Sequence, residues 1–206
     1  MKARLLIGTC LFVVLAFGVS MQSTAQDKDK KEDKPKSEKF SALAYMPHGA
    51  GPAMVGSGAR VNVDVWVNSY TSDAEAKTLA TALLEGGSDS LLKALEKADT
   101  IGKIRLNGRA GFYDFKLIRS HQFEGGRRIY LVGDRPVGFL EMYVGNRSQD
   151  YPFGIMQLDL KKNSKGREEG TGALLYAAKI KVLENNRIEL ESYGIDAIRL
   201  LGVRKF

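Results

Sequence analysis

Cysteine is nearly missing from this 206-residue chain: Cys10 is the only one, and it lies in an N-terminal hydrophobic segment. The remainder of the chain therefore cannot form a disulfide, a thiol nucleophile or a cysteine-based zinc site. A domain of this size without disulfides must be held together by its hydrophobic core, and the length is sufficient for one.

Histidine is almost as scarce, since the chain contains two, His48 and His121. A metal site needs two or more such ligands to converge. The partners that the sequence offers are the carboxylates of Asp64, Asp114 and Glu141, so these three residues and His121 are the candidates for a hydrolytic site. We predict no bound metal and no cofactor.

Recognisable nucleophile and phosphate-binding motifs are lacking too. No serine lies in a Gly-x-Ser-x-Gly elbow, and the nearest approach is Gly56-Ser57-Gly58. The glycines Gly51 and Gly56 have the spacing of a phosphate-binding loop, but Ser57 occupies the position of its lysine and the segment precedes a predicted strand. The sequence therefore predicts neither an acyl-transfer hydrolase nor a P-loop nucleotidase.

One long hydrophobic run is present, Leu5 to Val19, and it follows the basic residues Lys2 and Arg4. Small residues precede a cleavage position after Ala25, which is the pattern of a secretory signal peptide spanning residues 1–25. An uncleaved anchor is the alternative, but the run is shorter than the roughly 20 residues that a spanning helix needs. We expect a secreted or periplasmic protein without a transmembrane anchor after cleavage.

Residues 26–39 are strongly charged, with lysines and acidic residues interleaved and Pro35 as the single apolar residue. This composition predicts a disordered linker. A nucleic-acid-binding arm would not interleave acids so evenly, and no cluster of basic and aromatic residues follows, so we predict no nucleic-acid partner. Residues 40–206 then form a single domain, and its first part, Phe40 to Gly58, is expected to be a loop because it is rich in Gly and Pro.

A strand and two helices are predicted next. Arg60–Asn68 alternates valines with mostly polar residues, which is typical of a half-buried strand. Ser72 and Glu75 have the spacing of a capping box, and Gly86-Gly87 is expected to end the helix that begins there. A second helix continues through Lys97. We expect the two helices to form a hairpin that covers the open face of a sheet.

The rest of the chain alternates strand patterns with turn signals. The predicted strands are Ile101–Leu106, Gly111–Phe123, Arg128–Val132, Val137–Val144, Met156–Leu160, Leu174–Leu183, Arg187–Glu191 and Ala197–Val203. Their short connections indicate an antiparallel β-meander rather than βαβ units. We therefore predict one α+β domain, in which an antiparallel sheet of about eight strands forms a sandwich or partial barrel and a two-helix hairpin follows the first strand.

Several turn and strand motifs carry a resemblance to other proteins. They are Gly125-Gly126-Arg127-Arg128-Ile129, Asp134-Arg135-Pro136, Asp150-Tyr151-Pro152-Phe153, Gly170-Thr171-Gly172 and Ile188 to Gly194. On these motifs the chain resembles a group of uncharacterised exported proteins of acidobacterial type, over most of Val61 to Arg204. The resemblance implies an exported bacterial protein and brings no catalytic residue or ligand with it.

One pair of carboxylates has a spacing that could be catalytic. Glu189 and Glu191 share a strand face, about 6.5–7 Å apart by strand rise, which is close to the separation found in glycosidases. Alternation toward solvent explains them better, because Lys179 and Lys181 on the neighbouring strand are expected to face them in cross-strand ion pairs. We interpret these four residues as structural.

Aromatic and arginine side chains are the remaining candidates for binding. The candidate binding residues are Trp66, Tyr70, Tyr143, Tyr151, Arg127, Arg128 and Arg135. If exposed, the aromatic residues would mark a binding face or a pocket mouth, and the alternative is that they pack beneath the helices. The arginines, with the cluster Lys161 to Arg167, would allow docking on anionic surface polymers, and such binding would weaken with salt.

The lack of a reactive group of residues predicts a non-catalytic domain. We expect it to bind a protein partner or a small apolar ligand in the groove between the helix pair and the sheet. The alternative is a carboxylate- and histidine-dependent hydrolase of the cell envelope. That alternative requires His121 to converge with the candidate carboxylates.

Overall fold

The computed structural model describes residues 37–46, 60–138, 150–183, 187–192 and 196–206. The elements in these ranges are β1 (Glu38–Tyr45), β2 (Arg60–Val67), α1 (Asp73–Lys97), β3 (Gly102–Leu106), β4 (Tyr113–Phe115), β5 (Leu117–Phe123), β6 (Gly126–Gly133), β7 (Phe153–Lys162), β8 (Glu168–Val182), β9 (Ile188–Ser192) and β10 (Ile198–Lys205). Of the predicted strand Val137–Val144, residues 139–144 lie outside the described residues.

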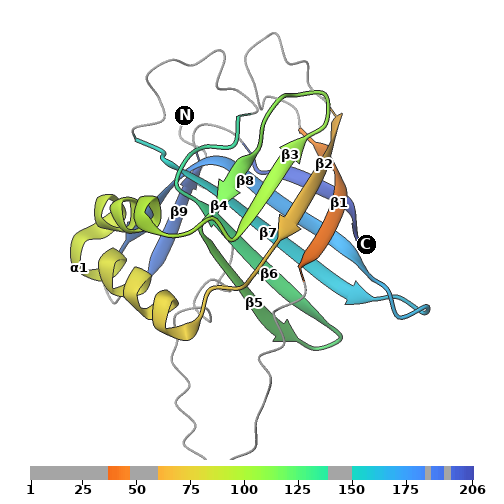
Figure 1. Ribbon diagram of the computed structural model, residues 1–206, viewed down its shortest axis with the longest axis horizontal. Coiled ribbons are helices and arrows are strands. Elements are labelled where there is room, and N and C mark those ends of the chain that lie inside the picture. The colour runs from red at the N-terminus through yellow and green to blue at the C-terminus, as the bar shows by residue number, and fades with distance from the viewer. Residues whose placement is uncertain (1–36, 47–59, 139–149, 184–186, 193–195) are drawn as a thin grey trace, which may run out of the picture.

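The strands form one antiparallel sheet that curls into a nearly closed barrel (Figure 1). The strand order is β4-β3-β2-β1-β10-β8-β7-β6-β5, and β9 pairs with the far end of β8. The two ends of this order, β4 and β5, follow each other in the chain with Lys116 between them. The Lys116 amide donates to the Val132 carbonyl of β6 at 2.9 Å, so the chain itself joins the two ends of the sheet.

The prediction of an α+β fold with about eight strands and a two-helix hairpin after the first strand is wrong. The described residues are mostly β, with ten strands, and their one helix, α1, follows the second strand. Within α1 the backbone leaves helical geometry at Gly87 (φ 69°, ψ −162°), where the glycine pair was expected to end a first helix. Helical turns resume directly after it, so the glycine produces a kink and no separate loop.

The expectation of a loop from Phe40 onward is also wrong, because β1 begins at Glu38 and continues to Tyr45. Phe40, Ala42 and Ala44 are buried in the barrel, while Leu43 is part of the partly exposed outer face. Because both faces of the strand carry apolar residues, the sequence shows no period of two from which a strand could be predicted.

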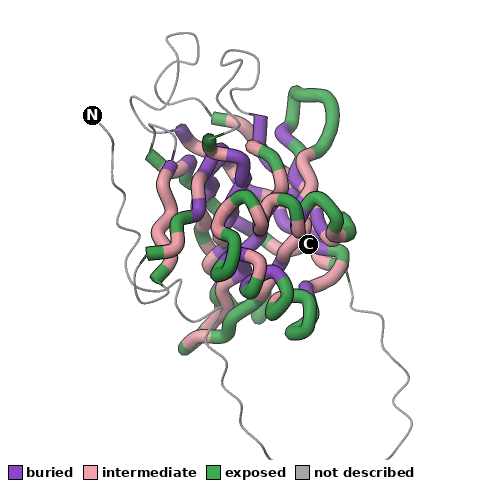
Figure 2. The backbone as a smooth tube through the Cα atoms, turned by 90° about the vertical axis from the view of Figure 1, so that its left-hand side faces the viewer, coloured by how far each residue is buried: buried purple, intermediate pink, exposed green. Residues whose placement is uncertain are grey.

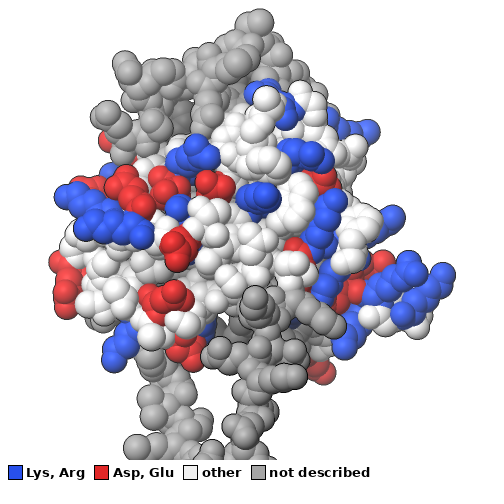
Figure 3. Space-filling view, viewed as in Figure 1, with Lys and Arg blue, Asp and Glu red and all other residues white. Residues whose placement is uncertain are grey.

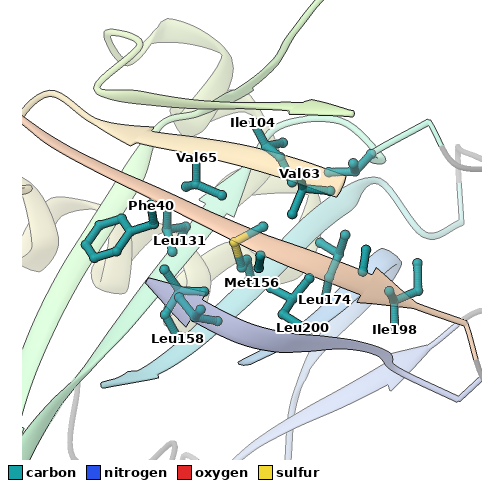
Figure 4. Packing of buried hydrophobic residues seen from close by; sticks show 14 of the residues in the cluster. Phe40, Val63, Val65, Ile104, Leu131, Met156, Leu158, Leu174, Ile198 and Leu200 are labelled. Atoms are coloured by element: carbon teal, nitrogen blue, oxygen red, sulfur yellow. The ribbon is translucent and has the colours of Figure 1, made fainter. Parts of the chain in front are cut away.

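Inward-facing residues of almost every strand fill the barrel with one hydrophobic cluster (Figure 4). Phe40, Val65, Leu131, Met156 and Leu200 come from five different strands and are at most 1% exposed. Figure 2 shows the same separation along the chain, with buried residues inside the barrel and exposed ones at its turns. Each large side chain buried in this way contributes roughly 1.5–3 kcal/mol relative to an exposed one.

The predicted single strand Gly111–Phe123 is two strands with a corner between them. Phe115 and Ile118 are both fully buried although they are three positions apart. A continuous strand would place them on opposite faces. Lys116 lies between them outside the pairing, and its Nζ donates to the carbonyl of Ala98 at 2.9 Å. This corner explains the imperfect alternation of the sequence.

Helix α1 lies on the outside of the barrel, against the face of β7, β8 and β9 (Figure 1). Leu79, Leu83, Leu91 and Leu95 of the helix are buried in a second hydrophobic cluster with residues of these strands, among them Ile180. The barrel therefore has two separate apolar regions, one inside the sheet and one between the sheet and α1.

Candidate functional site

A cavity of about 100 Å³ lies between α1 and the outer face of the sheet. The helix lines it with Ala76, Leu79, Ala80, Leu83, Leu91 and Leu95. Strands β5 to β9 line it with Leu117, Arg119, Tyr130, Val132, Ile155, Ile180, Ile188 and Leu190. Aliphatic side chains dominate both walls, so the cavity favours an apolar occupant over water.

The helical repeat and the kink together place α1 over this cavity. Leu79 and Leu83 are four residues apart and therefore lie on one face of the first half of the helix. The positive φ of Gly87 redirects the chain, and Leu91 and Leu95 of the second half return to the same cavity. Without the kink, a straight helix could not follow the curved outer face of the barrel with both halves.

The first turn of α1 is fixed to the sheet by polar contacts. The Ser72 hydroxyl accepts from the Glu75 amide at 3.3 Å and the Glu75 carboxylate accepts from the Ser72 amide at 2.8 Å, which is the predicted capping box. Arg119 of β5 forms an ion pair with Asp73 at 2.7 Å and donates to the Thr71 carbonyl at 2.8 Å. The N-terminal end of the helix is thus anchored to β5.

Past the kink, the contact between α1 and the sheet involves Ser88, whose hydroxyl donates to the carbonyl of Ile180 in β8. The two halves of α1 are therefore tied to different strands, with the cavity between the two attachment points.

The polar side chains of the cavity wall offer no reactive group. The guanidinium of Arg119 is occupied by Asp73 and the Thr71 carbonyl. Tyr130 is buried at 6% exposure beside hydrocarbon neighbours. Among the described residues, no buried side-chain nitrogen or oxygen lacks a hydrogen-bond partner. The described residues that line the cavity include no carboxylate, histidine, cysteine or serine, so they would hold a ligand mainly through contact with hydrocarbon.

A second candidate site lies at one open end of the barrel. Its residues are Glu38, Tyr70, Arg127, Glu168 and Lys205, which we call the end cluster. Arg127 donates to both oxygens of Glu168 at 2.7 Å, and to Glu38 at 3.0 Å. Tyr70 donates to Glu38 at 2.6 Å, and the Lys205 amine lies 2.7 Å from the same carboxylate. Two cations and two anions therefore neutralise each other within the end cluster.

The contacts of the end cluster determine its protonation. Burial alone would raise the pKa of the Glu38 carboxyl, but hydrogen bonds from Lys205, Tyr70 and Arg127 outweigh it and hold the pKa below its usual 4.5. Burial and the Arg127 hydrogen bonds oppose each other in the same way at Glu168, whose pKa is also lowered. Burial and the Glu38 carboxylate raise the pKa of Tyr70. All four charged residues of the end cluster are therefore ionised near neutral pH.

An open cavity of about 1100 Å³ lies over the end cluster, between the β5–β6 turn and the β7–β8 turn. Its wall includes Phe123, Lys162, Arg167 and Phe206 in addition to residues of the end cluster. The cavity is much larger than the one under α1, but its central charged groups already bond to each other. We regard the end cluster as a device that closes the barrel end, because a ligand would have to break those bonds to bind there.

The three candidate hydrolytic residues that the structure describes lie on separate strands, each with its own surroundings. Asp64 of β2 pairs with Arg105 at 3.0 Å, and Asp114 of β4 lies 3.8 Å from Arg135. His121 is exposed on β5. Glu141 lies outside the described residues. In the described part of the chain, no group of three or more metal-ligating side chains gathers in one place.

The candidate binding residues are dispersed in the same way. Tyr70 and Arg127 belong to the end cluster, and Arg128 pairs with Asp159 on the neighbouring strand. The Tyr151 hydroxyl donates to Glu191 at 2.7 Å. Tyr143 lies outside the described residues. Arg135 lies 3.8 Å from Asp114, and Trp66 is on the outer face of β2 among basic residues.

The prediction that the lysines of β8 face the glutamates of β9 is confirmed, and one ion pair of the expected kind is formed. Lys179 lies opposite Glu191 and Lys181 opposite Glu189 in the register, and Lys181 forms an ion pair with Glu191. The Tyr151 hydroxyl also donates to this carboxylate. Lys181 neutralises Glu191, so these contacts stabilise the sheet edge next to the α1 cavity.

The sequence did not indicate the strand side of the α1 cavity or the end cluster. Ile155, Ile180 and Ile188 read as ordinary strand residues, and nothing in their pattern showed that they share one outer face. Glu38 lay in the segment predicted to be a disordered linker, and Glu168 lay between the predicted strands Met156–Leu160 and Leu174–Leu183. For Glu38 a signal was available. It is two residues before the buried Phe40, and alternate residues of a strand share a face, so Glu38 faces the barrel interior.

Comparisons of the chain with protein-family models, with curated proteins and with solved structures find no match. The described residues also contain no helix with the length and hydrophobicity needed to cross a membrane. The site must therefore be interpreted from its own geometry.

Proposed function

We propose that this protein is an exported, non-catalytic binding protein that holds a small apolar ligand between α1 and the outer face of the sheet. The observation that carries the proposal is the aliphatic cavity of about 100 Å³ beneath the kinked helix. Apolar cavities of this order stay dry and bind small hydrocarbons. The occupant is a molecule of a few carbon atoms, or the end of a longer acyl or aryl chain.

Two further features support a ligand that enters and leaves. The cavity wall is made by elements that are attached separately, through Arg119 near the start of α1 and Ser88 after the kink. Gly87 lies between these attachments and supplies a position about which the halves of the helix can move. Export is part of the proposal because of the N-terminal hydrophobic run and the charged segment after it.

The test uses benzene, a neutral hydrocarbon of a size that such a cavity admits, as the probe, with binding measured by calorimetry, together with native mass spectrometry of the protein as purified from its producing cells. Ala80→Leu adds hydrocarbon to a residue that lines the cavity, whereas Thr81→Leu adds the same side chain at the next, exposed position of the helix. We expect Ala80→Leu to weaken probe binding at least tenfold, about 1.4 kcal/mol, and Thr81→Leu to leave it unchanged.

Native mass spectrometry supplies an independent readout. A reproducible additional mass that extracts into organic solvent, and that is lost in Ala80→Leu, would support the proposal and identify the ligand. If the probe does not bind, or if both variants bind it as well as the parent while remaining folded, the cavity is packing space and the proposal fails.

A further inference from the structure

Three aromatic rings and two lysines alternate across the outer face of the sheet. In order across the strands they are Phe206, Lys39, Trp66, Lys103 and Phe112, which we call the lysine–aromatic row. The Lys39 amine lies 5.7 Å from the centroid of the Phe206 ring and 5.2 Å from that of Trp66. The Lys103 amine lies 5.6 Å from the Trp66 centroid and 4.5 Å from that of Phe112. Every step of the row is a cation–π contact.

The register of the sheet produces this order. Lys39 of β1 lies opposite Trp66 of β2, and Trp66 lies opposite Lys103 of β3. The amide of Phe206, which follows β10, donates to the Lys39 carbonyl at 2.9 Å. From Phe206 to Lys103 the row therefore crosses the strands at right angles, and the backbones of its two lysines are two strands apart, or about 9.5 Å along the sheet. On β4 the residue opposite Lys103 is Asp114, and the Phe112 ring also packs edge-to-face against Trp66, with the centroids 5.7 Å apart.

Within the described residues the register places Asp114 opposite Lys103, and the Asp114 carboxylate lies 3.8 Å from Arg135. Neither Lys39 nor Lys103 forms an ion pair there, whereas the adjacent Arg105 pairs with Asp64 and also lies 5.6 Å from the Trp66 ring. Three cations thus surround one indole. In Figure 3 the side of the molecule where β1, β2 and β3 face the viewer carries many Lys and Arg side chains, with uncharged surface and a few Asp and Glu side chains between them. Such an arrangement attracts an anionic partner.

We propose that the lysine–aromatic row binds a linear acidic polysaccharide in which charged and neutral sugars alternate. The rings hold both lysine side chains over the sheet, so little side-chain entropy is lost when each amine meets a carboxylate. The uncharged ring of Trp66 lies between the two amines, and this arrangement suits a polymer whose carboxylates are separated by a neutral sugar. The end rings, Phe206 and Phe112, are 76% and 42% exposed and offer apolar contact to that part of the chain.

The geometry favours this partner over the other anionic polymers and surfaces. Duplex DNA carries one charge per about 1.7 Å of its axis, far denser than two lysines on strands that are about 9.5 Å apart. Stacking of single-stranded bases requires open ring faces, and the Trp66 ring already carries three cations. A membrane surface would contact a broad, flat area of the protein, whereas the residues of the row extend in one direction across the sheet. This binding surface is separate from the cavity under α1 and does not depend on it.

The test is binding of the purified protein to hyaluronate, an alternating polymer of acidic and neutral sugars, measured by calorimetry at low ionic strength. Lys39→Met with Lys103→Met removes both charges and keeps the aliphatic stems. The matched control is Lys161→Met with Lys165→Met, which removes the same charge from the exposed β7–β8 hairpin. We expect the first pair to weaken binding at least tenfold and the control pair to weaken it less than twofold.

A third variant separates positioned charge from charge alone. Trp66→Leu keeps all the lysines but removes the ring that holds them, and we expect it to weaken hyaluronate binding at least threefold while circular dichroism shows an intact fold. The proposal is overturned if hyaluronate does not bind or if the control pair weakens binding as much as the first pair. It is also overturned if Trp66→Leu binds normally, or if oligo(dT) or phosphatidylglycerol vesicles bind more tightly than hyaluronate.

Discussion

Arg127 and Glu38 join opposite walls of the barrel: the Arg127 Nη2 atom lies 3.0 and 3.1 Å from the two oxygens of the Glu38 carboxylate. The strands that carry them, β6 and β1, are four places apart in the sheet. Both side chains are almost buried, at 13% and 12% exposure. The pair therefore crosses the open end of the barrel above its hydrophobic core.

Arg127→Met tests how much the end cluster stabilises the barrel. The substitution leaves the Glu38 and Glu168 carboxylates buried with Lys205 as their remaining cation. We expect the free energy of unfolding to fall by about 3 kcal/mol, because an uncompensated buried charge is costly. Urea unfolding followed by circular dichroism measures the change.

Arg128→Met is the control for that substitution. Arg128 is the next residue of β6, and its ion pair with Asp159 is more exposed, at 25% and 31%. Loss of an exposed pair costs at most about 1 kcal/mol. Equal destabilisation by the two variants would show that the end cluster contributes no more than a surface ion pair.

The end cluster also predicts an acid-sensitive stability. The pKa values of Glu38 and Glu168 are lower in the folded protein than the usual 4.5. Their stabilising contribution is therefore complete above pH 4.5 and is lost as the pH falls through the lowered folded-state values. We expect the free energy of unfolding to decrease between about pH 5 and about pH 3, as measured by urea titrations at each pH.

Glu38→Gln identifies the source of that acid sensitivity. It removes one of the two titrating carboxyls, so the decrease in stability with falling pH should be shallower than in the parent. Glu96→Gln removes a carboxylate from the exposed face of α1 and serves as the control. A parental slope in Glu38→Gln would assign the acid sensitivity to other groups.

Gly170 allows β8 to approach β7 closely inside the barrel. A Cβ at this position would lie 1.8 Å from the carbonyl oxygen of Asp159, a backbone atom that cannot move aside cheaply. We expect Gly170→Ala to lower the free energy of unfolding by about 1–3 kcal/mol through overpacking. Thr171→Ala, at the exposed neighbouring position, should change it by less than about 0.5 kcal/mol. If the two variants are equally stable, the strands are not as close as the structure places them.

Local patterns predicted those parts of the fold that depend on local interactions. The valines of β2 alternate with mostly polar residues, and the capping box of Ser72 and Glu75 occurs where it was predicted. The β8–β9 hairpin was also recognisable, since its lysines and glutamates face each other in the register. In each case the signal lies within a few neighbouring residues, which is the range over which sequence periodicity is informative.

The rest depends on pairings between distant residues. β1 pairs with β10, almost the full length of the chain away, and no local pattern specifies that partner. The end cluster unites Glu38 with Lys205 in the same way. The cavity under α1 has two walls. The sequence did predict the apolar face of the helix, but it could not predict the second wall, because the outer faces of five strands come together only when the barrel closes.

The kink of α1 provides the last prediction. Gly87 has φ 69° and ψ −162°, a combination that is essentially restricted to glycine. Gly87→Ala should therefore lower the free energy of unfolding by about 1–3 kcal/mol. It should also weaken probe binding, because the half of the helix that carries Leu91 and Leu95 is displaced from the cavity. Glu85→Ala, on the exposed side of the helix just before the kink, is the control and should leave both quantities nearly unchanged. Increased stability in Gly87→Ala would instead mean that alanine extends a straight helix, in which case the kink is not required to form the cavity.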